Sequence, residues 1–600
     1  MPDHLASPEF SLLTGLLHQP HASQRALAQA TGLSLGSVNA TLKTVMTNGL
    51  VADGELTAAG LAALEPYRVD NAIIMAAGQS TRFAPISYEK PKGLLRVKGE
   101  ILIERTIRQL QAAGVTDITV VVGYKMEQFL YLEDAFNVKI VVNPVYAERN
   151  NNSTLKAVEA QLGNTYICSA DNYFTENVFE PYVWQAYYAA IWQDGPSDEY
   201  GLTIGPRDRI TQVTPGCADC WIMLGQAYFD RTFSAQFRQI LDRVYDLPEA
   251  AGKLWELIYA DHVKQLDMQI RRYQPGIVYE FDSLEDLKAF DPDFIVNIDS
   301  TILDNICRTL NVTRADLADF TPIPEGLTNL SVRFSAAGKD YVYRHPGVAT
   351  QGILNRAAEA EAEAIAHDLG LDLSFVYLDP DQGWKISSYV AVTDHFDYHN
   401  PDHLARALDL IRRLHQSGQT SPAEFDIYHG AGRYVDLLTA PGMPDAGQRV
   451  DFPDFRSLGA MAEQLYDLVE SDHVAKVLCH NDFYETNLLL EGDQTYLIDW
   501  EYVGMSDYAS DLGVFICCSD YDYDEAMTVL TTYFGRTPTP AELRHCVAYI
   551  ALAAYHWWTW ALYKDACGEP VGQYTYLWYR FAKDYGERAL SMYQESESCN

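Results

Sequence analysis

The alternation of apolar and polar positions divides the chain into three segments. Residues 1–68 carry short amphipathic helix patterns around a glycine turn, followed by a short strand pair and a closing helix. Residues 69–292 alternate buried strand patterns with amphipathic helix patterns, which predicts a parallel sheet with helices on both faces. Residues 293–600 start with a helix and a strand pair and continue as a mostly helical lobe. The pattern therefore predicts a multidomain protein of mixed α/β and α+β class.

Composition narrows the class of protein. Apolar residues make up 48% of the 600 residues and charged residues 21%, as in an ordinary soluble globular enzyme. The formal net charge of −38 argues against broad nucleic-acid binding, but local cations and magnesium can still bind nucleotides. The start of the chain lacks the pattern of a signal peptide, and no apolar run reaches the length of a membrane span. The ten cysteines are scattered, with a lone CxxC at Cys217 and Cys220, so we expect a reducing, cytoplasmic location.

The segment 1–68 contains RALAQATGLSLGSVNATLKTVMTNGLV, which resembles the winged helix-turn-helix domains of the MarR-like kind. Its expected recognition helix offers one basic side chain, Lys43. The whole segment adds only Arg25 and Arg68, against five acidic side chains. Phosphate contacts supply most of the affinity for DNA. The charge therefore favours a structural or dimerising role, and hence a homodimer, over DNA binding, which stays open.

A strand that runs into a small-residue loop marks the first nucleotide-binding pattern. NAIIM leads into AAGQSTRF, where Ala76, Ala77 and Gly78 let backbone amides approach a triphosphate closely. Arg82 and Lys92 follow, and both can neutralise charge on the α-phosphate and on the departing pyrophosphate. The loop together with the two cations predicts nucleotidyl transfer.

The string AAGxxxRF…KPKxLLxVxGExLIERxIxxL resembles sugar-phosphate-type nucleotidyltransferases, above all the bacterial CTP:phosphocholine cytidylyltransferases. The resemblance implies a Rossmann-like α/β/α sandwich with CTP as substrate, and Mg²⁺ held by Asp171 and Asp282. Asp171 follows a strand, at the sheet edge where ligands bind. Asn151 matches the family's NN-x-S/T stretch and is implied to contact the nucleotide or the acceptor. An ordinary helix N-cap stays open for Asp282, because SLEDLKAF follows it.

The family surrounds the amine of its acceptor with aromatic and acidic side chains. Trp221, Trp255, Glu256 and Tyr259 lie in the corresponding region, although they do not align residue by residue. The resemblance implies phosphocholine as the acceptor. An ethanolamine or aminoethylphosphonate head group suits the same region, so the chemistry is implied more firmly than the head group.

Residues 479–501, CHNDFYETNLLLEGDQTYLIDWE, hold the second pattern. Phosphoryl transfer needs a carboxylate that orients the accepting hydroxyl, and ligands for the magnesium ions on the β- and γ-phosphates. Asp482 suits the first task, and Asn487 and Asp499 suit the second. The alternative is an acidic turn between two buried strands. It is disfavoured because the same chain holds a second complete nucleotide-handling motif upstream.

Upstream of this loop, GLTN at residues 326–329 predicts a phosphate-facing hairpin turn. Arg344 stands where kinases place the strand cation for the α- and β-phosphates, and Glu359 on the next helix can pair with it or face solvent. Together with YVYRHPG, LCHNDFYETNLLL and LIDWEYVGMSDYASDLG, these features resemble the bacterial choline kinase family. The resemblance implies a bilobal, protein-kinase-like fold of the aminoglycoside-phosphotransferase kind, with ATP and Mg²⁺.

Trp557 and Trp560, in AYHWWTWALYKD, are three residues apart and share one helix face. Tryptophan faces attract quaternary ammonium groups through cation–π contact, although such stripes are also common in plain cores. The kinase resemblance favours a choline box, with Glu501 as a counter-charge or as a brace for the loop. Asp511, in SDLG, is expected to support the catalytic loop.

The two patterns predict a bifunctional enzyme that phosphorylates choline with ATP and couples phosphocholine to CTP, giving CDP-choline and pyrophosphate. The resemblance to these bacterial enzymes implies that the product feeds phosphocholine decoration of surface glycopolymers. The same two reactions on ethanolamine, or on an aminophosphonate such as 2-aminoethylphosphonate, form the first alternative. A metabolite-sensing transcriptional regulator built from enzyme-derived domains is the second. That alternative predicts lost catalytic groups, whereas the expected ones are present.

Overall fold

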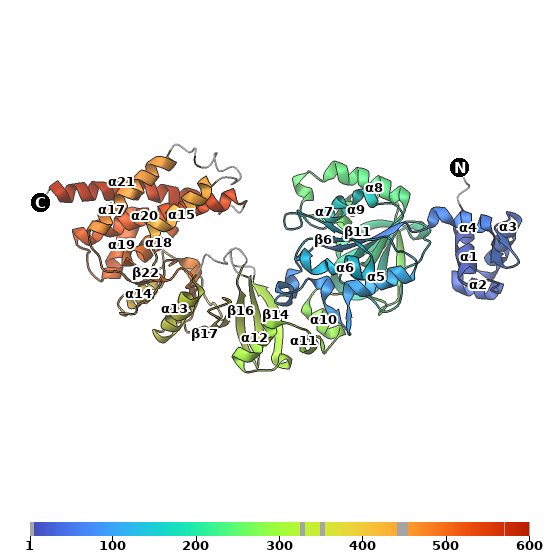
Figure 1. Cartoon of the computed structure of the whole chain (residues 1–600), viewed down its shortest axis with the longest axis horizontal. Helices are drawn as coiled ribbons and strands as arrows, with labels where there is room; N and C mark the ends of the chain where they lie inside the picture. Colours follow the sequence, from blue (N-terminus) through green and yellow to red (C-terminus); the bar gives the residue numbers. More distant parts are fainter. Residues whose placement is uncertain are drawn as a thin grey trace. The chain divides into compact units, whose positions relative to one another are not determined.

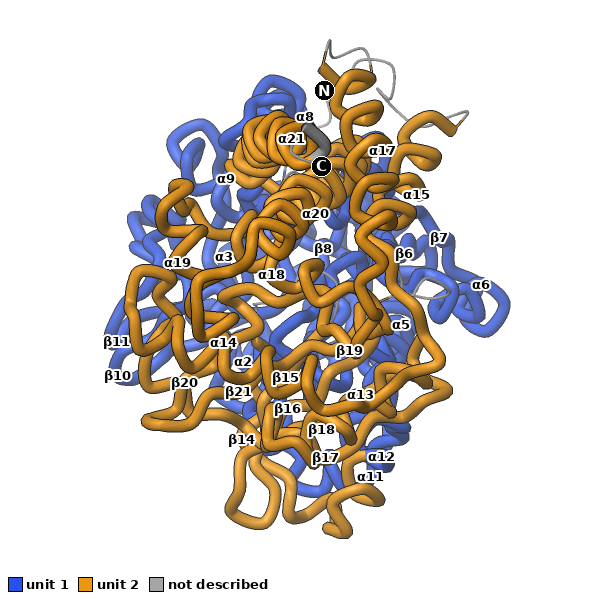
Figure 2. The backbone as a smooth tube through the Cα atoms, turned by 90° about the vertical axis from the view of Figure 1, so that its left-hand side faces the viewer, with its two compact units in different colours: residues 1–305 blue, residues 306–600 orange. Residues whose placement is uncertain are grey.

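The computed structural model describes residues 5–323, 330–347, 355–440, 450, 454–568 and 571–598. The chain forms two compact units, Met1–Asn305 and Ile306–Asn600, coloured blue and orange in Figure 2. The segments predicted for residues 1–68 and 69–292 share the first unit. Helix α12 (Thr301–Leu310) carries the chain across the division between the units.

The amino-terminal segment consists of short helices and a two-stranded hairpin (Figure 1). Leu13, Leu27 and Val45 of its first three helices meet in one core, because each lies on the apolar stripe of its helix. These elements follow the order that the apolar pattern predicts, and the winged-helix assignment stays a prediction. They are α1 (Ser7–His18), α2 (Gln24–Thr31), α3 (Leu35–Thr47), β1 (Val51–Ala52), β2 (Glu55–Leu56) and α4 (Ala58–Leu64).

A seven-stranded sheet forms the centre of the first unit, in the order β12-β10-β11-β8-β3-β6-β7. Strands β8, β3, β6 and β7 are parallel, as the alternating pattern predicts. The sheet is nevertheless mixed, because β11 runs antiparallel to both β8 and β10. A short turn joins β10 to β11, and parallel strands would need a longer crossover. The strands are β3 (Asn71–Ala76), β6 (Ile118–Val122), β7 (Lys139–Val142), β8 (Thr165–Ser169), β10 (Tyr187–Ile204), β11 (Ile210–Phe229) and β12 (Gln269–Tyr273).

Helices cover both faces of this sheet (Figure 1). Successive residues of β3 belong to different cores: Ile74 shares one with Ile107, and Ile73 shares the other with Phe237. Because side chains alternate across a strand, this arrangement is the expected α/β/α sandwich. The covering helices are α5 (Leu102–Ala112), α6 (Tyr131–Phe136), α7 (Asn152–Ala157), α8 (Arg231–Val244) and α9 (Trp255–Asp261).

Two cysteines of β11 depart from the expectation of free thiols. Cys217 and Cys220 form a disulfide. The two half-cystines are three positions apart in one strand. The bridge is therefore a local feature of the β10–β11 hairpin.

The second unit contains a five-stranded antiparallel sheet in the order β14-β15-β16-β18-β17. The strand pair expected from the sequence is confirmed as β15 and β16, which pair from Leu330 and His345 to Ala336 and Lys339. Helix α13 follows β16 in the chain and supplies the side chains that face it. The elements are β14 (Leu317–Ile323), β15 (Leu330–Ala336), β16 (Lys339–His345), α13 (Arg356–Asp368), β17 (Phe375–Leu378) and β18 (Lys385–Ser388).

The rest of the second unit is the expected helical lobe (Figure 1). Its central helix is α20, which is buried at every position from His545 to Thr559. Of the helices in the described ranges, none combines the length and the apolar character needed to span a membrane. The elements are α14 (Pro401–His415), α15 (Ile427–Thr439), α17 (Phe455–Ser471), β19 (Val477–Cys479), β20 (Leu488–Glu491), β21 (Gln494–Leu497), β22 (Gly504–Ser506), α18 (Tyr508–Cys518), α19 (Tyr523–Phe534), α20 (Pro540–Ala566) and α21 (Tyr574–Ser598).

Helices α18 and α20 approach closely where a glycine leaves room. A Cβ atom at Gly513 would lie 2.5 Å from the carbonyl oxygen of Tyr549. We expect Gly513→Ala to force the helices apart and to lower the free energy of unfolding of this unit by about 1–3 kcal/mol, as overpacking does. Gly432→Ala is the matched control, because a Cβ there meets no neighbouring atom within 4 Å. The control should be neutral or stabilising by up to about 1 kcal/mol. Urea denaturation measures both, and equal stabilities would contradict the close contact.

Candidate active sites

The first candidate site lies at the carboxyl ends of β3 and β8, where ligands bind in sheets of this kind. The loop after β3 and the acid that follows β8 line one cavity of about 210 Å³. A Cβ atom at Gly93 would lie only 2.8 Å from the Cβ of Ala170, so a glycine allows this turn to approach the sheet. The expected site residues that line the cavity are Ala76, Ala77, Gly78, Lys92, Asn151 and Asp171.

An ion-paired cluster borders this cavity. Lys92 Nζ lies 2.6 Å from a carboxylate oxygen of Asp171 and 4.0 Å from one of Asp282. Arg82 lies 3.1 Å from the same Asp282 oxygen. The helix-cap alternative for Asp282 is wrong, because Ser283 caps α10 (Leu284–Phe290). The structure therefore brings together the two cations and the two acids that the sequence motifs single out.

Two further carboxylates, which no motif reveals, join the cluster. Burial and the nearby Asp171 raise the pKa of Glu280 to about 8. Burial and a hydrogen bond with Asp282 raise the pKa of Glu199 to about 7. Asp171 keeps its Oδ1 buried and without a hydrogen-bond partner among the described residues. Carboxylate oxygens are the ligands that Mg²⁺ prefers, and a cation would relieve this excess of negative charge. The residues of the cluster thus fit Mg²⁺.

Asn151 connects the cavity to a buried acid. Its Oδ1 accepts a hydrogen bond from the Trp255 backbone N–H at 2.7 Å, and its Nδ2 donates one to Glu256 at 3.2 Å. The Tyr188 hydroxyl donates a second hydrogen bond to Glu256 at 3.3 Å. Burial raises the pKa of Glu256 to about 7. Burial, followed by the Glu256 carboxylate, raises the pKa of Tyr200, which places a second tyrosine near this acid. Tyrosine rings beside carboxylates suit a cationic group.

The structure places the aromatic residues expected to bind the acceptor elsewhere. Trp255 and Tyr259 are 1% and 0% exposed and belong to the core beneath α8, where Trp255 stacks on Tyr188. Trp221 is half-buried on the hairpin next to Trp192, and its ring already faces the guanidinium of Arg272 at 5.3 Å. Packing and an internal cation therefore occupy these three rings, and tyrosines stand near the acids instead.

The second candidate site gathers around the loop that follows β19. Asn487 donates a hydrogen bond from Nδ2 to Asp482 Oδ2 at 2.9 Å, so the expected metal ligand and the expected base lie side by side. Asp499 accepts a hydrogen bond from Arg344 at 2.8 Å. Burial, followed by the Asp499 and Glu501 carboxylates, raises the pKa of Asp482 well above its ordinary value. This excess of negative charge, with carboxylate and amide oxygens at hand, fits Mg²⁺.

Arg344, the cation expected to bind phosphates at this second site, is held by the carboxylate that the sequence predicts. The Arg344 guanidinium forms an ion pair with Glu359 of α13, and Glu359 is fully buried. The solvent-facing alternative for Glu359 is therefore wrong. A cation placed in advance by a carboxylate suits the α- and β-phosphates of a nucleotide. The hairpin turn expected at residues 326–329 lies outside the described residues.

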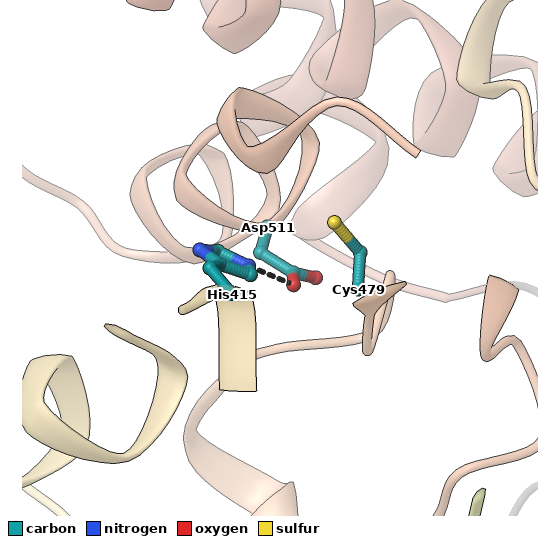
Figure 3. Close-up of side chains that lie close together, drawn as sticks. All are labelled: His415, Cys479 and Asp511. Carbon is teal, nitrogen blue, oxygen red and sulfur yellow. Dashed lines mark hydrogen bonds and ion pairs between the residues drawn. The ribbon is translucent and has the colours of Figure 1, made fainter. Parts of the chain in front are cut away.

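The catalytic loop rests on one buried aspartate (Figure 3). Asp511 of α18 accepts hydrogen bonds from the backbone N–H groups of His480 and Asn481. It also shares a hydrogen bond with His415, and Cys479 lies beside the group. Because both carboxylate oxygens of Asp511 already accept hydrogen bonds, these side chains form a support for the loop rather than a metal site. The supporting role expected of Asp511 is confirmed.

The tryptophan pair of α20 joins an aromatic cluster near this loop. The Trp557 ring lies 5.5 Å from that of Trp560 and 6.0 Å from that of Tyr502, between centroids. Burial raises the pKa of Tyr502, and the Glu501 and Asp482 carboxylates add to this shift, so the ring is close to Asp482. Glu501 is buried. The cluster also includes rings that no motif reveals, namely Tyr434, Tyr502 and Trp578.

Comparison with known proteins assigns the two halves. The MobA-like NTP transferase domain matches residues 72–199. The choline-phosphate cytidylyltransferase of Streptococcus pneumoniae is 30% identical over 220 residues, which cover 37% of this chain and 96% of that protein. This chain belongs to the cytidylyltransferase family. The 2-aminoethylphosphonate cytidylyltransferase of Lancefieldella rimae is 33% identical over 229 residues, which cover 38% of this chain and 93% of that protein.

The second half of this cytidylyltransferase matches the phosphotransferase enzyme family over residues 319–546. The crystal structure of a choline/ethanolamine kinase family protein from Mesorhizobium loti is 26% identical, with a TM-score of 0.37. That match covers 46% of this chain and 88% of the other. The chain is thus an enzyme that joins a nucleotidyltransferase domain to a kinase-like phosphotransferase domain.

The core position of Trp255 in this cytidylyltransferase can be tested. We expect Trp255→Ala to lower the free energy of unfolding of the first unit by about 3–5 kcal/mol, because a large buried ring is lost. Trp192→Ala is the matched control, since that ring is 40% exposed, and its loss should cost less than about 1 kcal/mol. Urea denaturation followed by circular dichroism measures both. Unchanged stability of Trp255→Ala, with a raised KM for the acceptor, would show that this ring binds the acceptor.

Proposed function

We propose that this chain phosphorylates choline with ATP and then couples the phosphocholine to CTP, releasing pyrophosphate. One observation supports this proposal: a single chain brings a cation and carboxylates together in two separate places, and each place lies beside aromatic rings. Lys92 with Asp171 builds one site, and Arg344 with Asp482 and Asp499 builds the other. The phosphorylated product of the kinase-like site has the chemistry that the cytidylyltransferase site needs in its acceptor.

In the first reaction, Asp482 accepts the proton of the choline hydroxyl while the oxygen attacks the γ-phosphate of ATP. The bond between the β- and γ-phosphates breaks, and ADP leaves. Arg344, held by Glu359, binds the α- and β-phosphates and stabilises the charge that develops on the leaving group. Asn487 and Asp499 would hold Mg²⁺, which spreads the negative charge of the phosphates when bound.

In the second reaction, a phosphate oxygen of phosphocholine attacks the α-phosphate of CTP, and pyrophosphate leaves. The attacking oxygen is already ionised near neutral pH, so this step requires no general base. Lys92 and Arg82 stabilise the charge on the α-phosphate and on the pyrophosphate. Asp171 and Asp282 would hold Mg²⁺ at this site. The loop after β3 supplies backbone amides to the triphosphate.

The surroundings of Tyr188 and Tyr200 favour a cationic head group on the acceptor. Buried Glu256 supplies negative charge there, and a trimethylammonium group gains cation–π contact without needing hydrogen-bond acceptors. The second candidate acceptor is 2-aminoethylphosphonate, because the Lancefieldella rimae relative carries that substrate in its name. Its ammonium group is also cationic, as is that of ethanolamine phosphate. The kcat/KM values for these three acceptors separate the candidates.

For residues 1–68 we propose a structural role. The rings of Phe10, Tyr67 and Trp184 lie 5.0 to 5.5 Å apart between centroids, which joins this segment to the chain that leads into β10. Arg68 and Tyr182 add a β-bridge between the same two parts. A segment that packs on the enzyme and is poor in basic residues suits support of the cytidylyltransferase domain better than DNA binding.

Separate removal of each site tests the proposed reactions. Asp482→Asn should abolish the formation of phosphocholine from choline and ATP, while the conversion of added phosphocholine and CTP stays within about twofold of wild type. Asp171→Asn should do the reverse, because each carboxylate serves only one site. The reactions are followed by ³¹P NMR with Mg²⁺ present. Loss of both reactions in either variant, or no turnover of choline by wild type, would contradict the proposal.

The buried acid beside the tyrosines predicts a dependence of acceptor binding on pH. Glu256 has its pKa raised to about 7, and only its ionised form attracts a cation. The KM for phosphocholine should therefore fall by up to about tenfold as the pH rises from about 6 to about 8. Glu256→Gln should have a high KM and retain only the weaker pH dependence due to Glu199 and Glu280. Steady-state rates at saturating CTP measure both, and identical pH profiles would exclude this role of Glu256.

A further inference from the structure

A second buried ion pair lies beside the one that holds Arg344. Lys385, at the start of β18, pairs with Glu363 of α13. The two residues are 6% and 0% exposed. Neither takes part in the proposed phosphoryl transfer. Burying two charges costs desolvation free energy, so the presence of this ion pair needs a physical explanation.

The two ion pairs form an ordered array. Strands β16 and β18 are neighbours (Figure 2). Arg344 and Lys385 are direct partners across this antiparallel pair. Glu359 and Glu363 are four residues apart on α13, so they lie on one helix face at successive turns. Arg344 pairs with Glu359 and Asp499, and Lys385 pairs with Glu363. Glu359 also accepts a hydrogen bond from Arg356 on its own helix. Two neighbouring cations thus face two neighbouring carboxylates.

The array leaves room for an incorrect pairing. Within the described part of the chain, Glu363 Oε2 and Arg344 Nε are buried without a hydrogen-bond partner. Burial raises the pKa of Glu363 to about 7, while Lys385 first and Arg344 to a smaller extent counteract this shift. Glu363 therefore already feels the charge of Arg344, and both residues have an atom free to bond.

We propose that Lys385 is a positioning residue of the kinase-like site: by holding Glu363, it leaves Arg344 to Glu359 and Asp499 and keeps the guanidinium in place for the nucleotide phosphates. This inference rests on the proposed function of that site. Without Lys385, Glu363 has lost its ion-pair partner, and its unbonded Oε2 competes with Glu359 for Arg344. Without Glu363, Lys385 has lost its ion-pair partner and keeps only the influence of the Asp372 carboxylate, so it competes with Arg344 for Glu359. Removing both leaves a neutral pair, and the competition ends.

Nucleotide affinity of the full chain tests this role. The probe is Mg·AMP-PNP, titrated by calorimetry without choline and with CTP present to occupy the cytidylyltransferase site. Lys385→Met and Glu363→Gln should each raise the Kd by about tenfold or more, because each leaves an unpaired charge next to the Arg344 pair. The conservative variant Lys385→Arg should stay within about threefold of wild type, since it keeps the ion pair.

The double variant Lys385→Met/Glu363→Gln separates positioning from mere packing. It should recover most of the affinity and bind within about threefold of wild type, because neither competitor for the Arg344 pair remains. A double variant as weak as the worse single variant would overturn the proposal, as would single variants within about twofold of wild type. The rate of the cytidylyltransferase reaction and the circular dichroism spectrum report whether each variant folds.

The choice of readout keeps this test apart from the test of function. Binding of Mg·AMP-PNP requires no acceptor, so a chain that fails to phosphorylate choline still gives all five affinities. If wild type binds the nucleotide but transfers no phosphate to choline, the proposed function fails while the positioning role is still decided. If choline is phosphorylated but the double variant does not recover its affinity, only the positioning role fails.

Discussion

Both candidate sites depend on one interaction, the ion pair between the cation that is proposed to bind phosphates and a carboxylate that is withdrawn from water. Lys92 with Asp171 in the first unit and Arg344 with Glu359 in the second are each largely buried. Breaking a buried ion pair by removing one partner costs about 3–5 kcal/mol of stability. Most single substitutions cost less than this. Neither cation could stay in place without its partner. The partner fixes the cation before the nucleotide arrives, so the phosphates bind to a site that needs little rearrangement.

Local spacing and strand topology account for the parts of the sites that sequence can predict. Asp482, Asn487 and Asp499 fall within one short stretch, where the chemistry of phosphoryl transfer restricts both residue type and order. Asp171 follows a buried strand, and the ends of parallel strands meet at one edge of the sheet, where Lys92 pairs with it. Apolar periodicity likewise predicts the parallel strands, the α/β/α sandwich, and the strand pair β15 and β16.

Contacts between residues far apart in the sequence account for the parts of the sites that the sequence does not reveal. Trp255 and Tyr259 are aromatic, as the residues of a cation-binding site are, but aromatic residues are equally common in a hydrophobic core. Only their packing in the folded structure shows that these two belong to the core. Glu199 comes from the antiparallel hairpin β10–β11, whose pairing no local pattern specifies. Glu280 is different, because it ends a short strand only two residues before Asp282, and this nearness in the sequence to an expected site acid is a signal that could have revealed it.

The central claim is that one chain performs both transfers and that the second consumes the product of the first. The most direct test supplies choline, CTP and ATP whose γ-phosphate carries ¹⁸O, and then locates the label by mass spectrometry. We predict labelled CDP-choline, with the ¹⁸O in the phosphate next to choline and none in the pyrophosphate. Unlabelled CDP-choline, or label in the pyrophosphate, would contradict the claim.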